Sequence, residues 1–234
     1  MLPLRWVEPA RQRNEDISNG NNQPGIGFHE VEHWARIPCM RTTTILSKQR
    51  HFDFLRSLFP GAELTEELPT KHGLQLICFG TGVIVPSKTL DLFDGMVNFH
   101  AAPPNYPGRD PHHWAAYDKA RMYGATAHFM WPSVDAGPIC GVILQGVEPL
   151  GPSEYLKTGE NAAKALLVAW RDGGMSFDAN AAPLQWSGTK RSRSDLLAMC
   201  DMRGCSAVEI ERRTRAFAGF EREFILPSMA DAAP

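Results

Sequence analysis

Strand-like and helix-like segments alternate along the middle of this chain. Five short runs are apolar, or alternate apolar with polar side chains, as buried strands do; they cover residues 41–47, 74–79, 96–100, 125–130 and 139–147. The stretches between them predict helices at residues 50–59, 87–93, 110–123 and 152–171. This alternation predicts an α/β fold, in which a mostly parallel sheet carries helices on both of its faces.

The two ends of the chain differ from this middle part. Residues 17–27 are rich in Asn and Gly, a composition typical of loops. Beyond Asn180 the sequence is polar and less regular, with a basic stretch at residues 186–194 and a helix predicted at residues 207–217. We therefore expect three parts: an N-terminal extension at residues 1–39, a main domain at residues 40–179, and a short, irregular C-terminal extension at residues 180–234.

The overall charge does not indicate a polyanionic partner. The 234 residues carry a formal net charge of −2, which favours neither nucleic acid nor an anionic membrane surface. No apolar run approaches the ~18 residues of a membrane span, and the N-terminus lacks the apolar core of a signal peptide. We expect a cytoplasmic protein that binds neither nucleic acid nor membrane and holds anionic ligands through local basic groups.

The chain has five cysteines, and no two of them have Cys-x-x-Cys spacing. They are Cys39, Cys78, Cys140, Cys200 and Cys205. Because the number is odd and the spacing does not suit a metal, they are interpreted as buried, reduced thiols of a cytosolic protein.

Three polar residues stand at positions where an α/β sheet binds its ligands. Asn98 and His100 are two apart on a predicted strand, so their side chains point to the same face. They lie at the end of that strand, and open α/β sheets bind ligands beyond the carboxyl ends of their strands. Asp135 follows 35 residues after His100 on a loop that contains Gly137. We expect Asp135 to lie beside His100 at the same rim of the sheet.

The order and spacing of these residues resemble those of the formyltransferases that use N10-formyltetrahydrofolate. The hallmark of this family is Asn-x-His, a proline-containing loop and then Asp-x-Gly, which here are Asn98, His100 and Asp135. The flanking sequence from about residue 74 to 147 agrees with the family pattern. Two features depart from it: the loop at residues 101–104 reads Ala-Ala-Pro-Pro, and the region before Leu74 is short. The resemblance implies a Rossmann-like fold, N10-formyltetrahydrofolate as the formyl donor, and no metal.

The resemblance also implies a role for each residue. Asn98 and His100 would donate hydrogen bonds to the oxyanion that forms when an amine attacks the formyl carbon. His100 is the candidate base, and Asp135 would orient it, stabilise its charge or relay the proton through water. The residues expected to hold the folate are Thr81, Gly82, Val83, Ile84, Val85 and Val134. A plain glycine turn at Gly80–Gly82 is the alternative there, and a dinucleotide fingerprint would need a third glycine.

Among family members, the enzymes that act on nucleotide-linked amino sugars resemble this chain most. The implied acceptor is a 4-amino-4,6-dideoxyhexose destined for a surface polysaccharide, such as the O-antigen of lipopolysaccharide. The residues expected to bind it are Tyr106, Arg109, Trp114, Lys190 and Arg191. Arg109 precedes a predicted helix start, which suits an anion. A solvated basic surface remains the alternative for Lys190 and Arg191, and side-chain packing for the aromatic residues. A homodimer is also left open.

Other functions compete with formyl transfer. The segment from His29 to His33 reads HEVEH, which matches the zinc-protease signature. No third ligand is evident, so an accidental amphipathic helix is favoured. A non-catalytic homologue that binds folate or nucleotide is a second rival. A hydrolase with water as acceptor would need the same three residues as a transferase, and another small amine could also be the acceptor.

Overall fold

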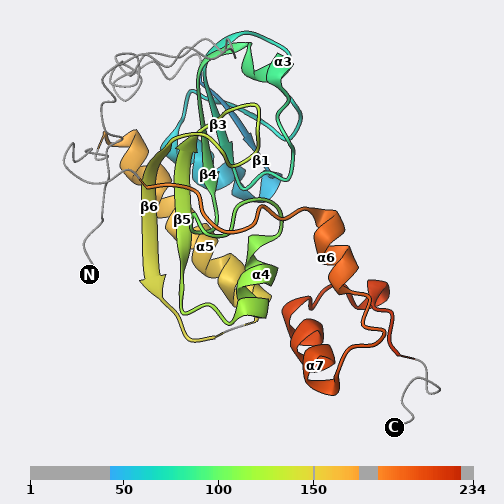
Figure 1. The fold of residues 1–234 in the computed structure, drawn as a ribbon. Helices are drawn as coiled ribbons and strands as arrows, with labels where there is room; N and C mark the ends of the chain where they lie inside the picture. Colours follow the sequence, from blue (N-terminus) through green and yellow to red (C-terminus); the bar gives the residue numbers. More distant parts are fainter. Residues whose placement is uncertain (1–42, 150, 174–183, 228–234) are drawn as a thin grey trace, which may run out of the picture.

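The computed structural model describes residues 43–149, 151–173 and 184–227, and a six-stranded sheet is at its centre (Figure 1). The strand order is β2-β1-β3-β4-β5-β6. The strands are β1 (Thr43–Ser47), β2 (Glu63–Thr65), β3 (Gly73–Phe79), β4 (Phe93–His100), β5 (Met122–Phe129) and β6 (Ile139–Gly146). β1 to β4 are parallel, whereas β5 is antiparallel to both β4 and β6. The α/β fold with a mostly parallel sheet is thereby confirmed.

The antiparallel strands follow from their connections. Only residues 130–138 join β5 to β6, which is too short for the crossover of a dozen or more residues that parallel neighbours require. Between β4 and β5 the chain forms helix α4 (Pro111–Asp118), which packs on α5 and α7 rather than crossing a face of the sheet. The loop that carries Asp135 therefore returns directly beside β5.

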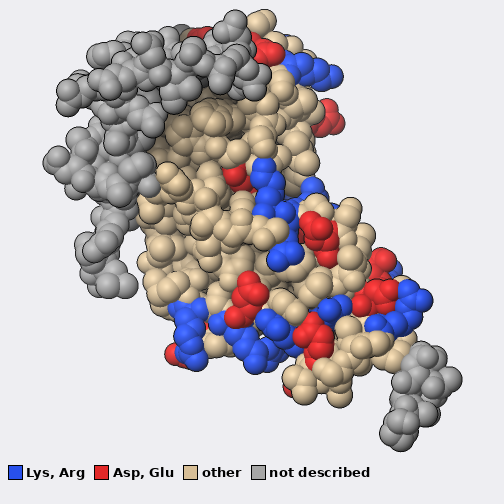
Figure 2. All heavy atoms as spheres, viewed as in Figure 1, with Lys and Arg blue, Asp and Glu red and all other residues tan. Residues whose placement is uncertain are grey.

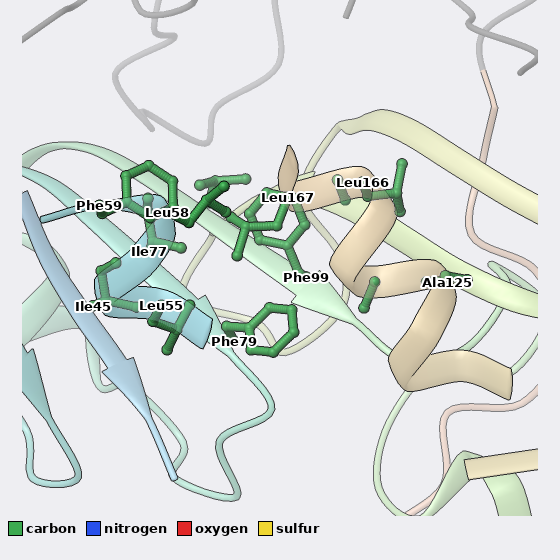
Figure 3. Close-up of a cluster of buried hydrophobic side chains, with 14 of the residues drawn as sticks. Ile45, Leu55, Leu58, Phe59, Ile77, Phe79, Phe99, Ala125, Leu166 and Leu167 are labelled. Atoms are coloured by element: carbon green, nitrogen blue, oxygen red, sulfur yellow. The ribbon is translucent and has the colours of Figure 1, made fainter. Parts of the chain in front are cut away.

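Helices cover both faces of the sheet, as expected. Besides α4, they are η2 (Gln49–His51), α2 (Phe52–Leu58), α3 (Ser87–Leu90), α5 (Pro152–Arg171), α6 (Arg193–Met199), α7 (Ala207–Ala216) and η3 (Glu221–Glu223). On one face, α2 and α5 pack against side chains of the strands (Figure 3). The other face is covered in part by α3 and the loop before it, through Val85 and Leu90. Asn98 and His100 belong to this second face, because Asn98 pairs with Cys78 of the same cluster.

The largest core cluster makes the strand ends a rigid base for a site. Ile45, Ile77 and Phe99 of three adjacent strands are almost fully buried. Leu55 of α2 and Leu166 of α5 close over them (Figure 3). Burying such side chains contributes about 1.5–3 kcal/mol each, so this cluster holds the central strands firmly together.

Removing one of these side chains tests whether α5 holds the sheet. Leu166→Ala is expected to lower the free energy of unfolding by about 2–5 kcal/mol, because it leaves a cavity under α5. Urea denaturation measures this change. The matched control is Lys157→Ala on the exposed side of α5, which should stay within about 0.5 kcal/mol of the wild type. A loss below about 1 kcal/mol for Leu166→Ala would contradict the packing described.

Several elements differ in extent from the sequence prediction. β4 begins at Phe93 and β5 at Met122, each three residues earlier than expected. α4 ends at Asp118, because Lys119 adopts a left-handed conformation with φ of 52°. Strand β2 and helix α6 were not predicted, although Ser192 before α6 forms a capping box with Asp195.

The C-terminal residues pack on the main body of the protein. α7 lies against α4, and Phe217 stacks on Tyr117 and meets Trp114 edge to face. The thiols of Cys78, Cys140 and Cys200 are buried, and Cys205 is partly exposed; all four are free. Among the described residues, no helix combines the length and apolar character needed to cross a bilayer. The expected N-terminal extension, Cys39 and the HEVEH segment lie outside the described residues.

Candidate active site

Strand β4 presents Asn98 and His100 side by side on one face of the sheet. The antiparallel partner β5 places His128 opposite Asn98 and Thr126 opposite His100. Thr126 is buried and donates its hydroxyl hydrogen to the Ala102 carbonyl, which holds the chain just beyond His100. Asn98 is therefore held by a strand on each side, and His100 is held by its pairing with β5.

Asp135 lies in the loop between β5 and β6 and points back toward β4. Its φ is +46°, a left-handed conformation that is unfavourable for a residue with a side chain. Gly137 lies two residues later, so close to the sheet that a Cβ there would collide with the Phe129 carbonyl. Because the loop is tight, the Asp135 carboxylate lies at the rim of the sheet, where the sequence predicted it.

The carboxylate of Asp135 lies between two imidazoles. Its Oδ2 accepts a hydrogen bond from the Gly108 amide at 2.7 Å and lies 3.6 Å from His100 Nδ1. Its Oδ1 lies 3.4 Å from His128 Nε2. The structure thus brings Asn98, His100 and Asp135 together and adds His128 to them.

Charge balance keeps Asp135 ionised although it is only 6% exposed. Burial by itself raises the pKa of this carboxyl. The neighbouring His100 and His128 and the Gly108 N–H outweigh burial and hold the pKa of Asp135 well below its usual range. The site therefore contains a buried negative charge between the two imidazoles.

Hydrogen bonds to the main chain orient both imidazoles. His100 Nε2 lies 2.9 Å from the Tyr106 carbonyl, which can only accept, so Nε2 carries the hydrogen. The other ring nitrogen, Nδ1, then faces Asp135. His128 Nδ1 lies 2.8 Å from the Phe129 carbonyl. In its neutral form His128 then accepts at Nε2 from the Asn98 amide, 3.0 Å away. The contact fixes which way the Asn98 amide faces.

His128 is the residue of the candidate cluster that the sequence did not predict. It is 3% exposed and is the second-to-last residue of β5, a strand that is buried over most of its length. A histidine on a strand predicted to be buried was the available signal. Its partner could not be inferred, because the contact with Asn98 depends on antiparallel pairing of β4 and β5, and a parallel sheet was expected.

A cavity of about 660 Å³ opens beside this cluster, and Asn98, His100, His128 and Asp135 line it. Every residue expected to hold the folate also lines it: Thr81, Gly82, Val83, Ile84, Val85 and Val134. The side chains of Val83, Ile84 and Val134 are 38%, 63% and 39% exposed, so apolar groups face the opening. Trp131, 52% exposed, also lines the cavity and was not expected there.

Of the residues expected to bind the acceptor, Arg109, Lys190 and Arg191 line the cavity. Tyr106 and Trp114 do not. Tyr106 packs against Tyr123, and Trp114 is 4% exposed within the second core cluster. The two residues lie behind the cavity wall, where Trp114 supports the Arg191 guanidinium 4.5 Å above its ring.

The basic side chains around the cavity form two groups, those with an ion-pair partner and those without one. Arg50 and Arg193 form ion pairs with Glu160 and Asp110. Within the described part of the chain, four other basic lining residues form no ion pair; they are Lys48, Arg109, Lys190 and Arg191. Figure 2 shows Lys and Arg gathered over the part of this face formed by α4, α6 and α7, with Asp and Glu among them. Positive charge without an ion-pair partner is therefore present around the cavity.

The described residues contain no group of three or more His, Cys, Asp or Glu placed to hold a metal ion. The cluster instead joins an amide, two imidazoles and a carboxylate. Such groups can donate hydrogen bonds to an oxyanion and move a proton.

Comparison with known proteins points to the same class. Residues 56–161, which include all four residues of the cluster, match the family described as formyl transferase. This part of the chain is therefore similar to formyl transferases, and the resemblance indicated by Asn98, His100 and Asp135 is confirmed.

Individual relatives agree with this class. Phosphoribosylglycinamide formyltransferase of Escherichia coli is 33% identical over 96 residues, which are 37% of this chain and 44% of that protein. The chain thus spans less than half the length of this relative. A sugar N-formyltransferase of Shewanella superposes with a TM-score of 0.59 at 15% identity, covering 76% of this chain and 88% of that one.

A third relative was solved with ligands. The N-formyltransferase of Helicobacter canadensis, in complex with folinic acid and dTDP-3-aminofucose, has a TM-score of 0.51 at 20% identity and covers 79% of this chain and 68% of its own. At such identities the likeness to both solved structures shows a shared fold, in agreement with the Rossmann-like sheet that was expected.

Proposed function

We propose that the protein transfers the formyl group of N10-formyltetrahydrofolate to the amine of a nucleotide-linked amino sugar. One observation carries the proposal: a buried, ionised Asp135 lies between His100 and His128, beside the Asn98 amide, at the wall of a cavity. Acyl transfer to an amine needs a donor for the oxyanion, a base for the amine proton and a counter-charge for that base. The cluster supplies each of them.

We assign each step of the reaction to a residue of this cluster. The bound folate supplies an activated formyl group. When the amine adds to its carbon, the Asn98 amide donates to the oxygen that becomes negative, a contribution of about 10²–10³ in rate. His100 accepts the proton that the amine loses, and Asp135 stabilises the resulting imidazolium. The proton then returns to the folate nitrogen as the C–N bond breaks, and such proton transfer contributes about 10²–10⁴.

The cavity suits a folate. Its volume of about 660 Å³ lies in the usual range of roughly 300–1,000 Å³ for small-molecule sites. Val83, Ile84 and Val134 offer apolar contacts to a flat ring, and the main chain around Gly82 offers hydrogen-bonding groups. The relative from Helicobacter canadensis was solved with folinic acid, which supports a folate for this chain as well.

The acceptor class is supported by the basic rim. A nucleotide-linked sugar carries a pyrophosphate, and Lys48, Arg109, Lys190 and Arg191 form no ion pair among the described residues. Arg191 is held over Trp114, which orients its guanidinium for a charge-assisted bond. We assign Tyr106 and Trp114 supporting roles, through the Tyr106 carbonyl on His100 and the Trp114 ring under Arg191.

Within this class we favour a 4-amino-4,6-dideoxyhexose, on a cytoplasmic route to a surface polysaccharide such as the O-antigen of lipopolysaccharide. The structural relative from Shewanella is a sugar N-formyltransferase. The relative from Helicobacter canadensis is an N-formyltransferase that was solved with a dTDP-linked amino sugar. The Escherichia coli relative is a phosphoribosylglycinamide formyltransferase, so phosphoribosylglycinamide is the second acceptor to test.

An acceptor screen tests this proposal. Purified protein is incubated with N10-formyltetrahydrofolate and one acceptor at a time: dTDP- or UDP-linked 3-amino and 4-amino sugars, phosphoribosylglycinamide, or water alone. We expect N-formyl product with a nucleotide-linked amino sugar only. Product with phosphoribosylglycinamide only would overturn the acceptor class, and equal folate turnover in water alone would make the protein a hydrolase.

A further inference from the structure

A segment from the C-terminal part of the chain crosses directly over the candidate site. Residues 184–192 bind the loop after β4 through Ser187 N–H to the Pro104 carbonyl at 3.0 Å and Arg191 N–H to the Pro107 carbonyl at 3.1 Å. Gly188 has a φ of +72°, and a Cβ there would collide with the Asn105 carbonyl. Figure 1 shows this segment passing in front of β5 and β4 on its way to α6. It is therefore a fixed strap over the site.

The strap places one indole against both imidazoles of the catalytic cluster. The Trp186 ring meets His128 edge to face, with centroids 4.9 Å apart and planes at 86°. It meets His100 in the same manner at 5.7 Å and 70°. Its Nε1–H donates to the Gly137 carbonyl at 2.8 Å. One side chain thus touches two of the proton-handling groups and the loop that carries the third.

The Asp135 loop has to be held from outside. Residues with a side chain rarely adopt a left-handed conformation, although Asp does so more readily than most, and such conformations persist where the surroundings fix them. Several contacts fix this loop: Gly108 N–H on the Asp135 carboxylate, the close fit of Gly137 on Phe129, Lys190 on the Ser133 hydroxyl, and Trp186 on the Gly137 carbonyl. Trp186 is a side chain from outside the loop that bonds two residues from Asp135, so substitution can remove this contact.

The indole also limits water access to the buried charge. His128, His100 and Asp135 are 3%, 9% and 6% exposed, and the Trp186 ring lies against both imidazoles. Water at this position would screen the attraction between Asp135 and the imidazoles. Shielding and loop support both act on the geometry and charge of the cluster, without a contact to the reacting atoms.

We infer that Trp186 is a positioning residue for the catalytic cluster: its indole locks the rings of His100 and His128 and, through Gly137, the loop of Asp135. The inference rests on the proposed formyl transfer for its kinetic consequences. Through Trp186, the C-terminal strap contributes to catalysis by holding the cluster on the sheet in place.

Steady-state kinetics of Trp186→Ala and Trp186→Phe test the inference. Trp186→Ala is expected to lower kcat by about 10- to 100-fold, since displacements near 1 Å at a catalytic group can cost about 10². KM for folate and acceptor should stay within about 3-fold, the pattern of an interaction used in the transition state. Trp186→Phe keeps an aromatic ring and loses the N–H, so its kcat should lie between the two. A kcat of Trp186→Ala within about 3-fold of wild type, or a loss confined to KM, would overturn the inference.

A second measurement does not depend on turnover. The ring ¹⁵N signals of His100 and His128 report which nitrogen carries hydrogen. In the wild type each ring should show a single tautomer, with hydrogen on His100 Nε2 and His128 Nδ1. Trp186→Ala should convert them to mixtures, because rings that are free to turn lose their bonds to the Tyr106 and Phe129 carbonyls. Gln185→Ala, an exposed neighbour in the same strap, should not. Unchanged signals in folded Trp186→Ala would overturn the inference. Absent formyl transfer in the wild type would refute only the proposed function.

Discussion

The His100→Ala variant is expected to lose formyl transfer by a factor of about 10²–10⁴, because proton transfer by a positioned base contributes that much. The structure gives no substitute at this position, since His128 already binds the Asn98 amide and the Phe129 carbonyl. KM for the acceptor should change little. Initial rates of N-formyl product formation measure the effect.

Two controls make the His100 result interpretable. Loss of the imidazole leaves the buried Tyr106 carbonyl without its partner, which costs about 1–3 kcal/mol, so thermal unfolding must show that the variant is folded. His72→Ala removes an exposed imidazole outside the cavity and should leave the rate unchanged. A folded His100→Ala enzyme within about 10-fold of the wild type would remove His100 from the role of base.

Asp135→Asn is expected to reduce kcat by about 10²–10⁴, because His100 then loses the charge that stabilises its protonated form. The amide is nearly isosteric and can still accept from the Gly108 N–H, so the loop should keep its shape. Initial rates measure the effect, and Asp94→Asn, an exposed carboxylate at the start of β4, is the matched control. Near-normal turnover by Asp135→Asn would contradict the mechanism.

Asp135→Asn should also change how the free energy of unfolding depends on pH. The folded pKa of Asp135 lies below its unfolded value, so the ionised carboxylate stabilises the fold above the unfolded pKa of about 3.9. That stability is lost as the pH falls through the folded pKa. The free energy of unfolding of the wild type should therefore exceed that of Asp135→Asn at pH 5–6, and the difference should shrink as the pH falls below about 4. A difference independent of pH would mean that the carboxylate is not held by charge.

The position of the candidate catalytic trio could be predicted because its geometry is local or follows from the sheet. Asn98 and His100 share a face through strand periodicity alone, and Asp135 sits on a short glycine loop. The residues proposed to hold the folate at Thr81–Val85 follow the carboxyl end of β3, beside the end of β4, and all line the cavity. Lys48 follows the end of β1 at the same rim and could have been predicted by the same argument.

Residues that depend on tertiary pairing could not be predicted. His128 meets Asn98 only because β5 runs antiparallel to β4. Trp114 was expected at the acceptor, but α7 packs on α4 and encloses its ring, and no sequence period reveals that contact. Trp186 reaches the histidines only because the strap pairs with the loop after β4.

The central claim is that this cluster moves a formyl group from folate to an amine. The most direct measurement follows the label of N10-[¹³C]formyltetrahydrofolate in the presence of a nucleotide-linked amino sugar, with the wild type and Asp135→Asn side by side. We expect the ¹³C signal to appear in the amide of the sugar, in equal amount to the tetrahydrofolate released, and to be lost in the variant. Recovery of the label as formate, or equal transfer by Asp135→Asn, would contradict the account.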